Sequence, residues 1–393
     1  MKKNIAIIVP RLTGGGAERV ASNLSLYLSN EYEKYIIVYH AEKIDYPYKG
    51  KLINLNTKAA SNIIGKMINF VKRVYKIRKI KKQHHIETTI SFMEGPNIVN
   101  IFSKYKDQVI LSVHTFISKR EDNFYSKVYK KLIKMFYNMA DVIVVVSESI
   151  KKDLIKNYQL KKEKLRVIYN PMDIQAIQLM AKQEIEEKYS EIFSHPVMIN
   201  VGRCIKAKGQ WHLIRVFKKV KEKIPDIKLV ILGEGELKEY LENLVKELKL
   251  EEDVYFLGFQ KNPFQYISRS IVYVFPSLFE GFPNALPEAM ACGLPVIAAD
   301  CKSGPREILA PNTNIEMETQ TIQYTQYGIL VPVCDGNFYS AYDPLTEKEL
   351  VLVNSITNLV RDKDLSEKYA QYGRQRVQAF NIDRIIAKWI DII

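Results

Sequence analysis

The sequence predicts an α/β fold made of two doubly wound domains, each built on a parallel sheet. Short apolar segments alternate with amphipathic helical segments along the chain, which is typical of parallel strands joined by crossover helices. The alternation pauses at Asn170-Pro171, a turn signal, and then starts again. The 393 residues are also about twice the length of one ordinary domain.

The first half contains apolar runs at 5–9 and 142–146 that predict strands buried on both faces. Helix 17–29 places Val20, Leu24 and Leu28 on one face, as an amphipathic helix requires. The other predicted strands are 35–39, 88–92 and 109–113, and the other predicted helices are 66–82 and 127–137.

The second half repeats the pattern. Its predicted strands are 197–201, 228–232, 254–257, 272–275 and 296–299, and its predicted helices are 211–224, 237–248 and 380–393. The domain boundary is therefore expected near residue 170. The segment 301–342 predicts a long loop with a hairpin that ends at 329–333, and long loops in compact domains are usually functional or disordered.

Composition argues against several classes of protein. The four cysteines are isolated, which argues against a disulfide scaffold and a structural zinc site. The run 5–9 is shorter than a signal peptide requires, and no segment reaches the roughly 20 apolar residues of a spanning helix. We expect a reduced, cytosolic protein, either soluble or attached to the membrane from the cytosolic side.

The net charge of +14 is unevenly distributed. Residues 1–170 contain 32 basic and 14 acidic residues, whereas the remainder contains 26 and 30. This asymmetry predicts a polyanionic partner for the first half, either nucleic acid or an anionic membrane. No helix-turn-helix, RNP-like or zinc-finger pattern occurs, which favours the membrane.

Two glycine-rich turns follow predicted strands. Gly14-Gly15-Gly16 opens the first helix, where backbone amides could receive a phosphate or a polar sugar; a plain strand–helix turn is the alternative. The second turn runs from Gly202 to Gly209 and carries Arg203 and Lys208, which suit a diphosphate at the carboxyl end of a parallel strand. Its alternative is an exposed basic loop.

The segment 276–297 contains two glutamates eight residues apart. Gly281 and Pro283 predict that Glu280 lies on a loop and that a helix begins near Asn284. Glu288 then lies close to the helix N-terminus, where it can accept hydrogen bonds from sugar hydroxyls or simply offset the helix dipole.

Together these motifs resemble the family 4 glycosyltransferases over nearly the whole chain. The resemblance includes the glycine-rich opening, Val-Ile-Tyr-Asn-Pro-Met-Asp at 167–173, Gly-Arg followed by Lys-Gly, Leu-Gly-Glu-Gly at 232–235, Phe-Leu-Gly at 256–258, and the two-glutamate block. It implies a GT-B fold, in which two Rossmann-like domains with parallel sheets face each other across a cleft. Domain 1–170 would face acceptor and membrane and be joined by helix 380–393, and domain 171–379 would bind the nucleotide-sugar donor.

The resemblance also implies residue roles. Arg203 and Lys208 match the pair that holds the donor diphosphate. Glu280 matches the glutamate near the transferred sugar, and Glu288 matches the one that binds ribose. Other matches are His114 beside the reacting sugar and the donor contacts Gly15, Gly16, Asn284, Ala285 and Leu286. Glu94, at the end of strand 88–92, is expected to contact the acceptor.

The family retains the anomeric configuration and needs no metal, so no cofactor is expected beyond the nucleotide sugar. Arg203, Lys208 and a helix N-terminus can neutralise a departing diphosphate. The only Asp-x-Asp sequence, 362–364, is interpreted as a surface charge cluster.

Helices 66–82 and 127–137 are basic and amphipathic, which is typical of membrane-surface binding. The alternative is an ordinary sheet-covering helix with solvated lysines. Both can hold if the apolar stripe packs inward while the cations face lipid. The cations expected at an anionic membrane are Lys66, Lys72, Arg73, Lys76, Lys79, Lys130, Lys131 and Lys134.

The leading interpretation is a transferase that moves a hexose or N-acetylhexosamine, from UDP by preference, to a polyprenyl-diphosphate-linked saccharide in surface-glycan synthesis. It would work at the inner face of the cytoplasmic membrane. A GDP-mannose-dependent mannosyltransferase and a GT-B nucleotide-sugar epimerase stay open. A dinucleotide-dependent oxidoreductase would need a third glycine after Gly233 and Gly235. A nonenzymatic binder would leave the two-glutamate block unexplained.

Overall fold

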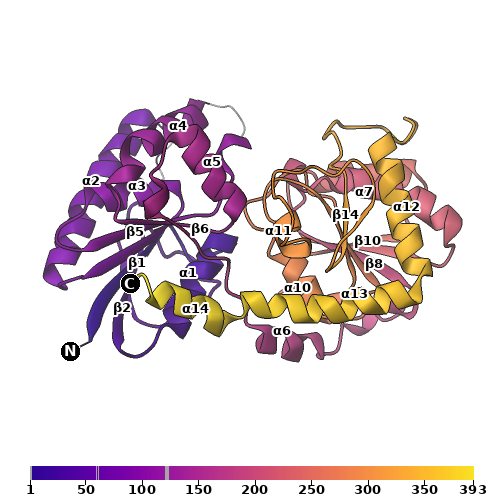
Figure 1. Ribbon diagram of the computed structural model, residues 1–393, viewed down its shortest axis with the longest axis horizontal. Coiled ribbons are helices and arrows are strands. Elements are labelled where there is room, and N and C mark those ends of the chain that lie inside the picture. The colour runs from indigo at the N-terminus through magenta and orange to yellow at the C-terminus, as the bar shows by residue number, and fades with distance from the viewer. Residues whose placement is uncertain (1, 59, 61, 120–123) are drawn as a thin grey trace. The chain divides into compact units, whose positions relative to one another are not determined.

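The computed structural model describes residues 2–58, 60, 62–119 and 124–393. The chain forms two compact units (Figure 1). Unit 1 comprises Met1–Pro171 and Ile382–Ile393, and unit 2 comprises Met172–Asn381. Both are α/β units built on a mainly parallel sheet, which confirms the predicted fold class.

Unit 1 contains a seven-stranded parallel sheet in the order β3-β2-β1-β4-β5-β6-β7. The strands are β1 (Lys3–Val9), β2 (Tyr32–Val38), β3 (Lys51–Asn54), β4 (Thr88–Phe92), β5 (Gln108–Val113), β6 (Val142–Val145) and β7 (Leu165–Val167). The α-helices are α1 (Gly16–Tyr27), α2 (Ile63–Gln83), α3 (Glu94–Phe102), α4 (Phe124–Phe136), α5 (Glu148–Tyr158) and α14 (Ile382–Ile390).

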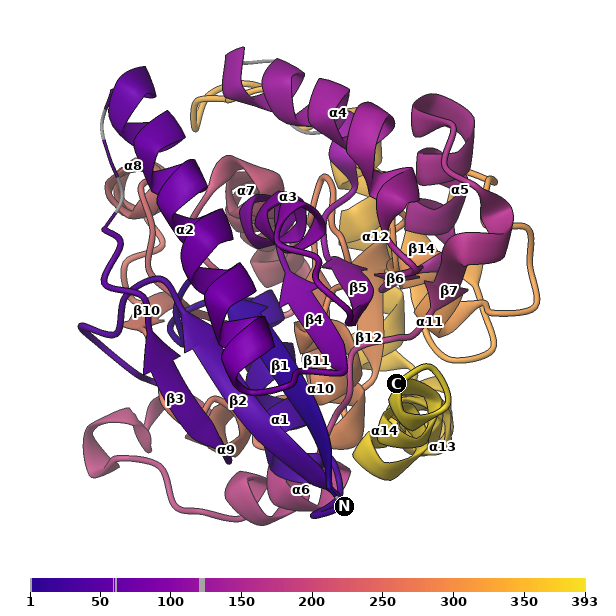
Figure 2. The ribbon, with the colours of Figure 1, turned by 90° about the vertical axis from the view of Figure 1, so that its left-hand side faces the viewer.

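The two faces of this sheet have separate cores. Along β1, Ile5 and Ile7 pack with α1 and α14, whereas Ala6 and Ile8 pack on the opposite face with α2 and α3. Figure 2 shows α2 lying over the strands of this second face. The apolar run 5–9 of β1 is stable only in this doubly covered position.

The C-terminal segment completes the first of these cores. Helix α14 buries Ile385 and Trp389 against α1 and β1. The predicted helix over 380–393 is shorter in the structure, because a 3₁₀ turn (Val377–Phe380) precedes α14.

Unit 2 contains a seven-stranded sheet in the order β10-β9-β8-β11-β12-β14-β13, in which the pairing of β13 with β14 is antiparallel. The strands are β8 (Val197–Val201), β9 (Lys228–Leu232), β10 (Val254–Gly258), β11 (Val272–Phe275), β12 (Val296–Ala299), β13 (Gln323–Tyr324) and β14 (Ile329–Val331). The α-helices are α6 (Ile174–Ala181), α7 (Gln210–Lys223), α8 (Lys238–Glu247), α9 (Phe264–Ile267), α10 (Ala285–Ala291), α11 (Pro305–Leu309), α12 (Glu347–Arg361) and α13 (Lys363–Arg376).

The segment 301–342 is more structured than a long loop. It contains α11 and the short β13–β14 hairpin. The Arg306 guanidinium pairs with Asp300 and also donates to Thr319 and Gln323. These bonds explain how a polar stretch with little regular structure keeps one conformation.

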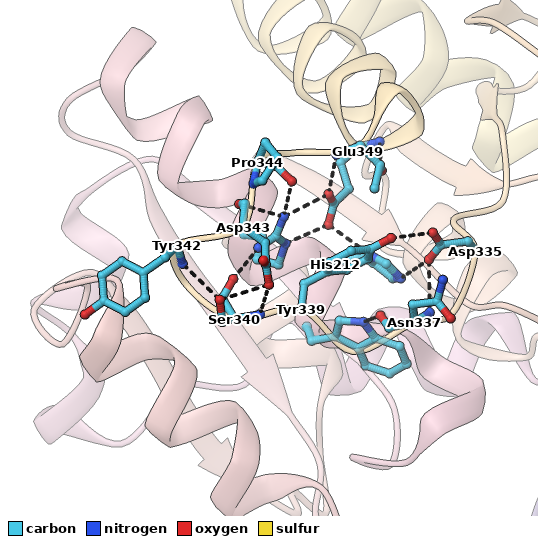
Figure 3. Close-up of polar contacts among 12 residues, drawn as sticks. His212, Asp335, Asn337, Tyr339, Ser340, Tyr342, Asp343, Pro344 and Glu349 are labelled. Atoms are coloured by element: carbon cyan, nitrogen blue, oxygen red, sulfur yellow. Dashed lines mark hydrogen bonds and ion pairs between the residues drawn. The ribbon is translucent and has the colours of Figure 1, made fainter.

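A buried ion pair organises the other irregular part of unit 2, residues 335–346 (Figure 3). Arg215 Nε lies 3.0 Å from Glu349 Oε1, and both side chains are almost fully buried, at 1% and 0% exposed. The guanidinium also donates to the carbonyls of Asp343 and Pro344, at 3.2 and 2.8 Å. His212 Nδ1 lies 2.9 Å from the same carboxylate. Arg215 thereby fixes this segment on α7.

Glu349 also caps the start of α12. Its carboxylate accepts from the Thr346 amide while the Thr346 hydroxyl accepts from the Glu349 amide, which is a capping box. Burial alone would raise the pKa of Glu349, but hydrogen bonds from His212 and Arg215 outweigh it and hold that pKa below 4.5.

We predict that Glu349→Gln destabilises the protein by roughly 3–5 kcal/mol at pH 7, because it leaves Arg215 buried without its counter-ion. Since folding lowers the pKa of Glu349, its contribution is present above pH 4.5 and is lost as the pH falls through the folded-state value. The difference between wild type and variant should therefore shrink below pH 4.5. Urea unfolding followed by circular dichroism at several pH values measures this.

The matched control is Glu347→Gln, which changes an exposed glutamate in the same helical turn. We expect it to alter stability by no more than about 0.5 kcal/mol. Equal effects of the two substitutions would contradict the assigned role of Glu349.

Candidate functional site

In unit 2, the loop after β8 begins with Gly202 and Arg203 and ends with the 3₁₀ turn Lys206–Lys208. The Arg203 side chain is exposed at the start of this loop. Gly209 follows the turn with φ +62°, and a Cβ there would lie 2.6 Å from the Pro276 carbonyl oxygen. Only glycine fits this position, so the loop is held close to the segment that follows β11.

The loop after β9 braces the same region. Gly233 has φ +147°, and any Cβ would overlap the carbonyl of Gly202. The Cys204 amide donates to the Glu234 carbonyl at 2.9 Å. The resemblance motif at 232–235 thus has a structural reason: its first glycine lets two strand-end loops touch.

Lys208 and Glu280 meet at the centre of this region. Lys208 Nζ lies 2.5 Å from Glu280 Oε1, and the side chains are 20% and 12% exposed. The Leu278 amide donates to Ala207 O at 2.8 Å, which joins the two loops. The structure therefore brings together two predicted site residues that are 72 positions apart.

Glu288 lies in the first turn of α10 and is buried. Burial raises the pKa of Tyr273 well above its ordinary value, and the charges of Glu288 and Glu280 raise it further. Both carboxylates therefore lie near this buried tyrosine, whose hydroxyl donates to Val201 O at 3.3 Å.

Helix α10 begins where the sequence predicted. Asn284 is the N-cap residue, as expected for a helix that begins there, and no side-chain cap bond is present. The Leu286 amide, expected to contact the donor, already donates to Pro283 O at 3.0 Å. The roles of Asn284, Ala285 and Leu286 as donor contacts stay predictions.

In unit 1, the predicted residues follow three neighbouring strands. Gly15 and Gly16 follow β1, Glu94 follows β4, and His114 follows β5. Since β1, β4 and β5 are adjacent and parallel, these residues lie along one edge of the sheet.

The surroundings of Gly15 and Glu94 refine the sequence interpretation. A Cβ on Gly15 would overlap the carboxylate of Glu18, so an anion of the chain itself lies at the start of α1. Glu94 is buried and is the first residue of α3, a helix that the sequence analysis missed. The residue before it, Met93, has φ +75°.

His114 is held by a neighbour that the sequence analysis missed. Its Nε2 lies 2.8 Å from Ser112 Oγ, and its ring lies 5.5 Å from the Phe92 ring. Burial lowers the pKa of His114 to about 3, so the imidazole is neutral at physiological pH. The two-residue spacing along one strand was the available signal for Ser112, since residues i and i+2 share a face.

The part of the chain that the structure describes contains no group of three or more His, Cys, Asp or Glu side chains that could hold a metal ion. Asp362 caps α13 by accepting from the Leu365 amide, so this member of the Asp-x-Asp sequence has a structural role. Metal independence stays a prediction.

Two family models match the chain. Residues 14–176 match the model described as Glycosyltransferase Family 4, and residues 181–323 match Glycosyl transferases group 1.

Relatives match over most of their length. An uncharacterized glycosyltransferase of Methanocaldococcus jannaschii is 37% identical over 87% of both chains. The N-acetylgalactosamine-N,N'-diacetylbacillosaminyl-diphospho-undecaprenol 4-alpha-N-acetylgalactosaminyltransferase of Campylobacter jejuni is 31% identical over 96% of both. Among solved structures, Anabaena HepE in complex with UDP-glucose superposes with a TM-score of 0.74 at 18% identity, over 99% of this chain and 100% of that one. Such likeness confirms the predicted GT-B fold.

We predict that His114 stays neutral between pH 5 and 8, because its folded-state pKa is about 3. In an NMR titration, the Hε1 signal of His114 should keep its chemical shift over this range. The signal is assigned by its disappearance in His114→Gln, and free imidazole in the sample serves as the pH reference. A midpoint near pH 6.5 would contradict the burial argument.

Proposed function

Because the chain belongs to the family 4 glycosyltransferases, we propose that it transfers a hexose or N-acetylhexosamine from a nucleotide sugar, with UDP as the favoured nucleotide, to a polyprenyl-diphosphate-linked saccharide. The proposal includes retention of the anomeric configuration and independence of metal ions. The reaction would contribute to surface-glycan synthesis. The observation that carries it is the ion pair of Lys208 with Glu280, which joins the loops that follow β8 and β11.

The charges of the site support a nucleotide sugar as the donor. Lys208 and Arg203 lie on one loop and supply cations for a diphosphate, which gains negative charge as the sugar leaves. Glu280 and Glu288 supply acceptors for hydroxyl groups of the sugar and ribose. This set matches a nucleoside diphosphate sugar in both charge and polarity.

The identity of the two substrates is supported by relatives. The HepE structures contain UDP, or UDP-glucose. The Campylobacter jejuni relative is named as an N-acetylgalactosaminyltransferase acting on a diphospho-undecaprenol-linked saccharide. We extend the nucleotide from the first protein, and the acceptor class from the second, to this chain.

A neutral His114 fits the same reaction. A neutral imidazole held by Ser112 can exchange hydrogen bonds with a sugar hydroxyl and adds no positive charge beside the reacting carbon. We propose that it positions the sugar, and that Glu94, on the neighbouring strand end, contacts the acceptor.

The surface of α2 supports membrane attachment, although not in the form that the sequence predicted. Ile77 of the apolar stripe is buried, but Met67 and Val71 are 66% and 65% exposed. The expectation that the whole stripe packs inward is therefore wrong. The exposed apolar side chains of α2 are Ile63, Ile64, Met67, Ile68, Val71 and Tyr75.

The cations of α2 also divide into two sets. Arg73 donates to the carbonyl of Thr57 at 2.8 Å and stacks on Tyr39, and Lys76 donates to Leu55 O at 2.7 Å. These two cations are directed back into unit 1, contrary to our expectation. Lys72 and Lys79 remain exposed near the apolar side chains, as does Lys82.

Exposed apolar side chains flanked by lysines are the composition of a helix that lies in the headgroup region of an anionic membrane. None of the described helices is long and apolar enough to span the bilayer. We propose that α2, aided by Lys130, Lys131 and Lys134 of α4, attaches the enzyme to the inner face of the cytoplasmic membrane, where a polyprenyl-linked acceptor would be available.

We predict that the protein binds UDP selectively in excess EDTA, and that Lys208→Ala weakens this binding by about tenfold or more, because it removes a charge-assisted contact. Calorimetry against UDP, GDP, ADP, CMP and NAD measures both effects. Lys206→Ala is the control, since Lys206 is in the same turn but lies over the Phe338 ring. Selective GDP binding would shift the donor to GDP-mannose, and binding of NAD alone would overturn the proposal.

We further predict that a triple variant, in which Lys72, Lys79 and Lys82 are all changed to Gln, binds phosphatidylglycerol vesicles on the order of 100-fold more weakly than wild type. Each lysine contributes roughly 1 kcal/mol to binding an anionic membrane surface. Vesicle co-sedimentation at low salt measures this, with phosphatidylcholine vesicles for comparison. The control changes Lys246, Lys249 and Lys261 of unit 2, which are exposed and alter the net charge equally. Equal losses in the two triple variants would favour solvated lysines over a membrane surface.

A further inference from the structure

We propose that Glu280 competes with the donor diphosphate for Lys208, so that the site favours a nucleotide sugar over the nucleoside diphosphate that remains after transfer. The inference rests on the proposed function and goes beyond it, because it concerns how the enzyme releases its product. The observation behind it is that the structure pairs the residue expected at the diphosphate with the residue expected at the sugar.

The pair is built into the site. Both side chains are mostly buried, so water screens the attraction only weakly. Glu280 is fixed by its amide, which donates to Lys302 O at 2.9 Å, and the Ser303 hydroxyl donates to Gly281 O at 2.6 Å. The loop that carries Lys208 is joined to the segment of Glu280 by the hydrogen bond from the Leu278 amide to Ala207 O.

The Lys208 side chain passes beside Gly202 and Phe275. Its Cδ and Cε lie 3.4 Å from the place that a Cβ on Gly202 would occupy, and its Nζ lies 5.5 Å above the centre of the Phe275 ring. A phosphate that binds Lys208 in this position shares the ammonium group with Glu280. The phosphate and the carboxylate carry the same sign, so each weakens the hold of the other on Lys208.

A nucleotide sugar resolves this conflict, whereas a free nucleoside diphosphate does not. When a sugar is present, its hydroxyl groups donate to Glu280 and replace the hydrogen bonds that the carboxylate loses from Lys208. When only the nucleoside diphosphate is present, Glu280 is mostly buried and loses its partner without a substitute, which costs free energy. Transfer of the sugar thus restores the competition and promotes release of the diphosphate.

The test measures UDP affinity by calorimetry in excess EDTA. If the wild-type protein selects GDP, GDP replaces UDP throughout. We expect Glu280→Gln and Glu280→Ala each to bind the nucleotide about fivefold more tightly than wild type, which corresponds to roughly 1 kcal/mol. Glu288→Gln is the matched control: it removes the other carboxylate near Tyr273 and should weaken binding, because that residue is expected at the ribose.

A double-mutant cycle separates competition from simple repulsion between Glu280 and the phosphates. If Glu280 acts through Lys208, Glu280→Gln gives no gain in a Lys208→Ala background, with displacement titration used for the weaker affinities. If Glu280 merely repels the nucleotide, the fivefold gain persists there and the inference is overturned.

The remaining outcomes are also decisive. Unchanged or weaker binding by both Glu280 variants overturns the competition and leaves the transferase proposal intact, provided that wild type binds UDP or GDP. Wild-type protein that binds neither nucleotide, with or without phosphatidylglycerol vesicles, overturns the proposed function and this inference together. Circular dichroism melts of both variants establish that a change in affinity is not a change in folding.

Discussion

Parallel strands can be joined only by crossovers, and all their carboxyl ends therefore emerge along one edge of a sheet. This constraint determines where chemistry can occur in each unit. In unit 2 it brings the loops after β8, β9 and β11 together, so that Lys208 and Glu280 meet although they are far apart in the sequence. In unit 1 it aligns the residues after β1, β4 and β5. In unit 1 the strands that carry these residues are packed on both faces.

Two ion pairs in unit 2 differ in how far solvent reaches them. The side chains of Arg215 and Glu349 are almost fully buried. Besides the carboxylate, the guanidinium donates to the backbone carbonyls of Ser340, Asp343 and Pro344. Separating this pair in the folded protein would leave two buried charges without partners, which costs free energy. Lys208 and Glu280 are joined by a similarly short contact but are reachable by solvent, and hence by a ligand. The two ion pairs thus differ in their exposure more than in their chemistry.

The sequence predicted the features that depend on local pattern. Strands with apolar runs, such as β1, β6 and β8, were found, as was the helix whose N-cap is Asn284. The edge strand β3 was missed because Lys51 and Asn54 interrupt its apolar character, and α3 was missed because its first turn contains Gly95 and Pro96. Periodicity gave α2 an apolar stripe but could not tell which part of it the fold would cover. Nor could it show that Arg73 reaches back to Thr57, since that bond depends on tertiary structure.

The position of α14 has a consequence for biosynthesis. Trp389 and Ile385 complete the core against α1 and β1, yet the ribosome makes them only after the whole of unit 2. At typical elongation rates, unit 1 must wait roughly 10 to 40 s with one face of its sheet uncovered. During that interval the nascent chain exposes apolar side chains that later become fully buried, which is when a chaperone would be most needed. Unit 2, whose residues are contiguous, carries no such delay.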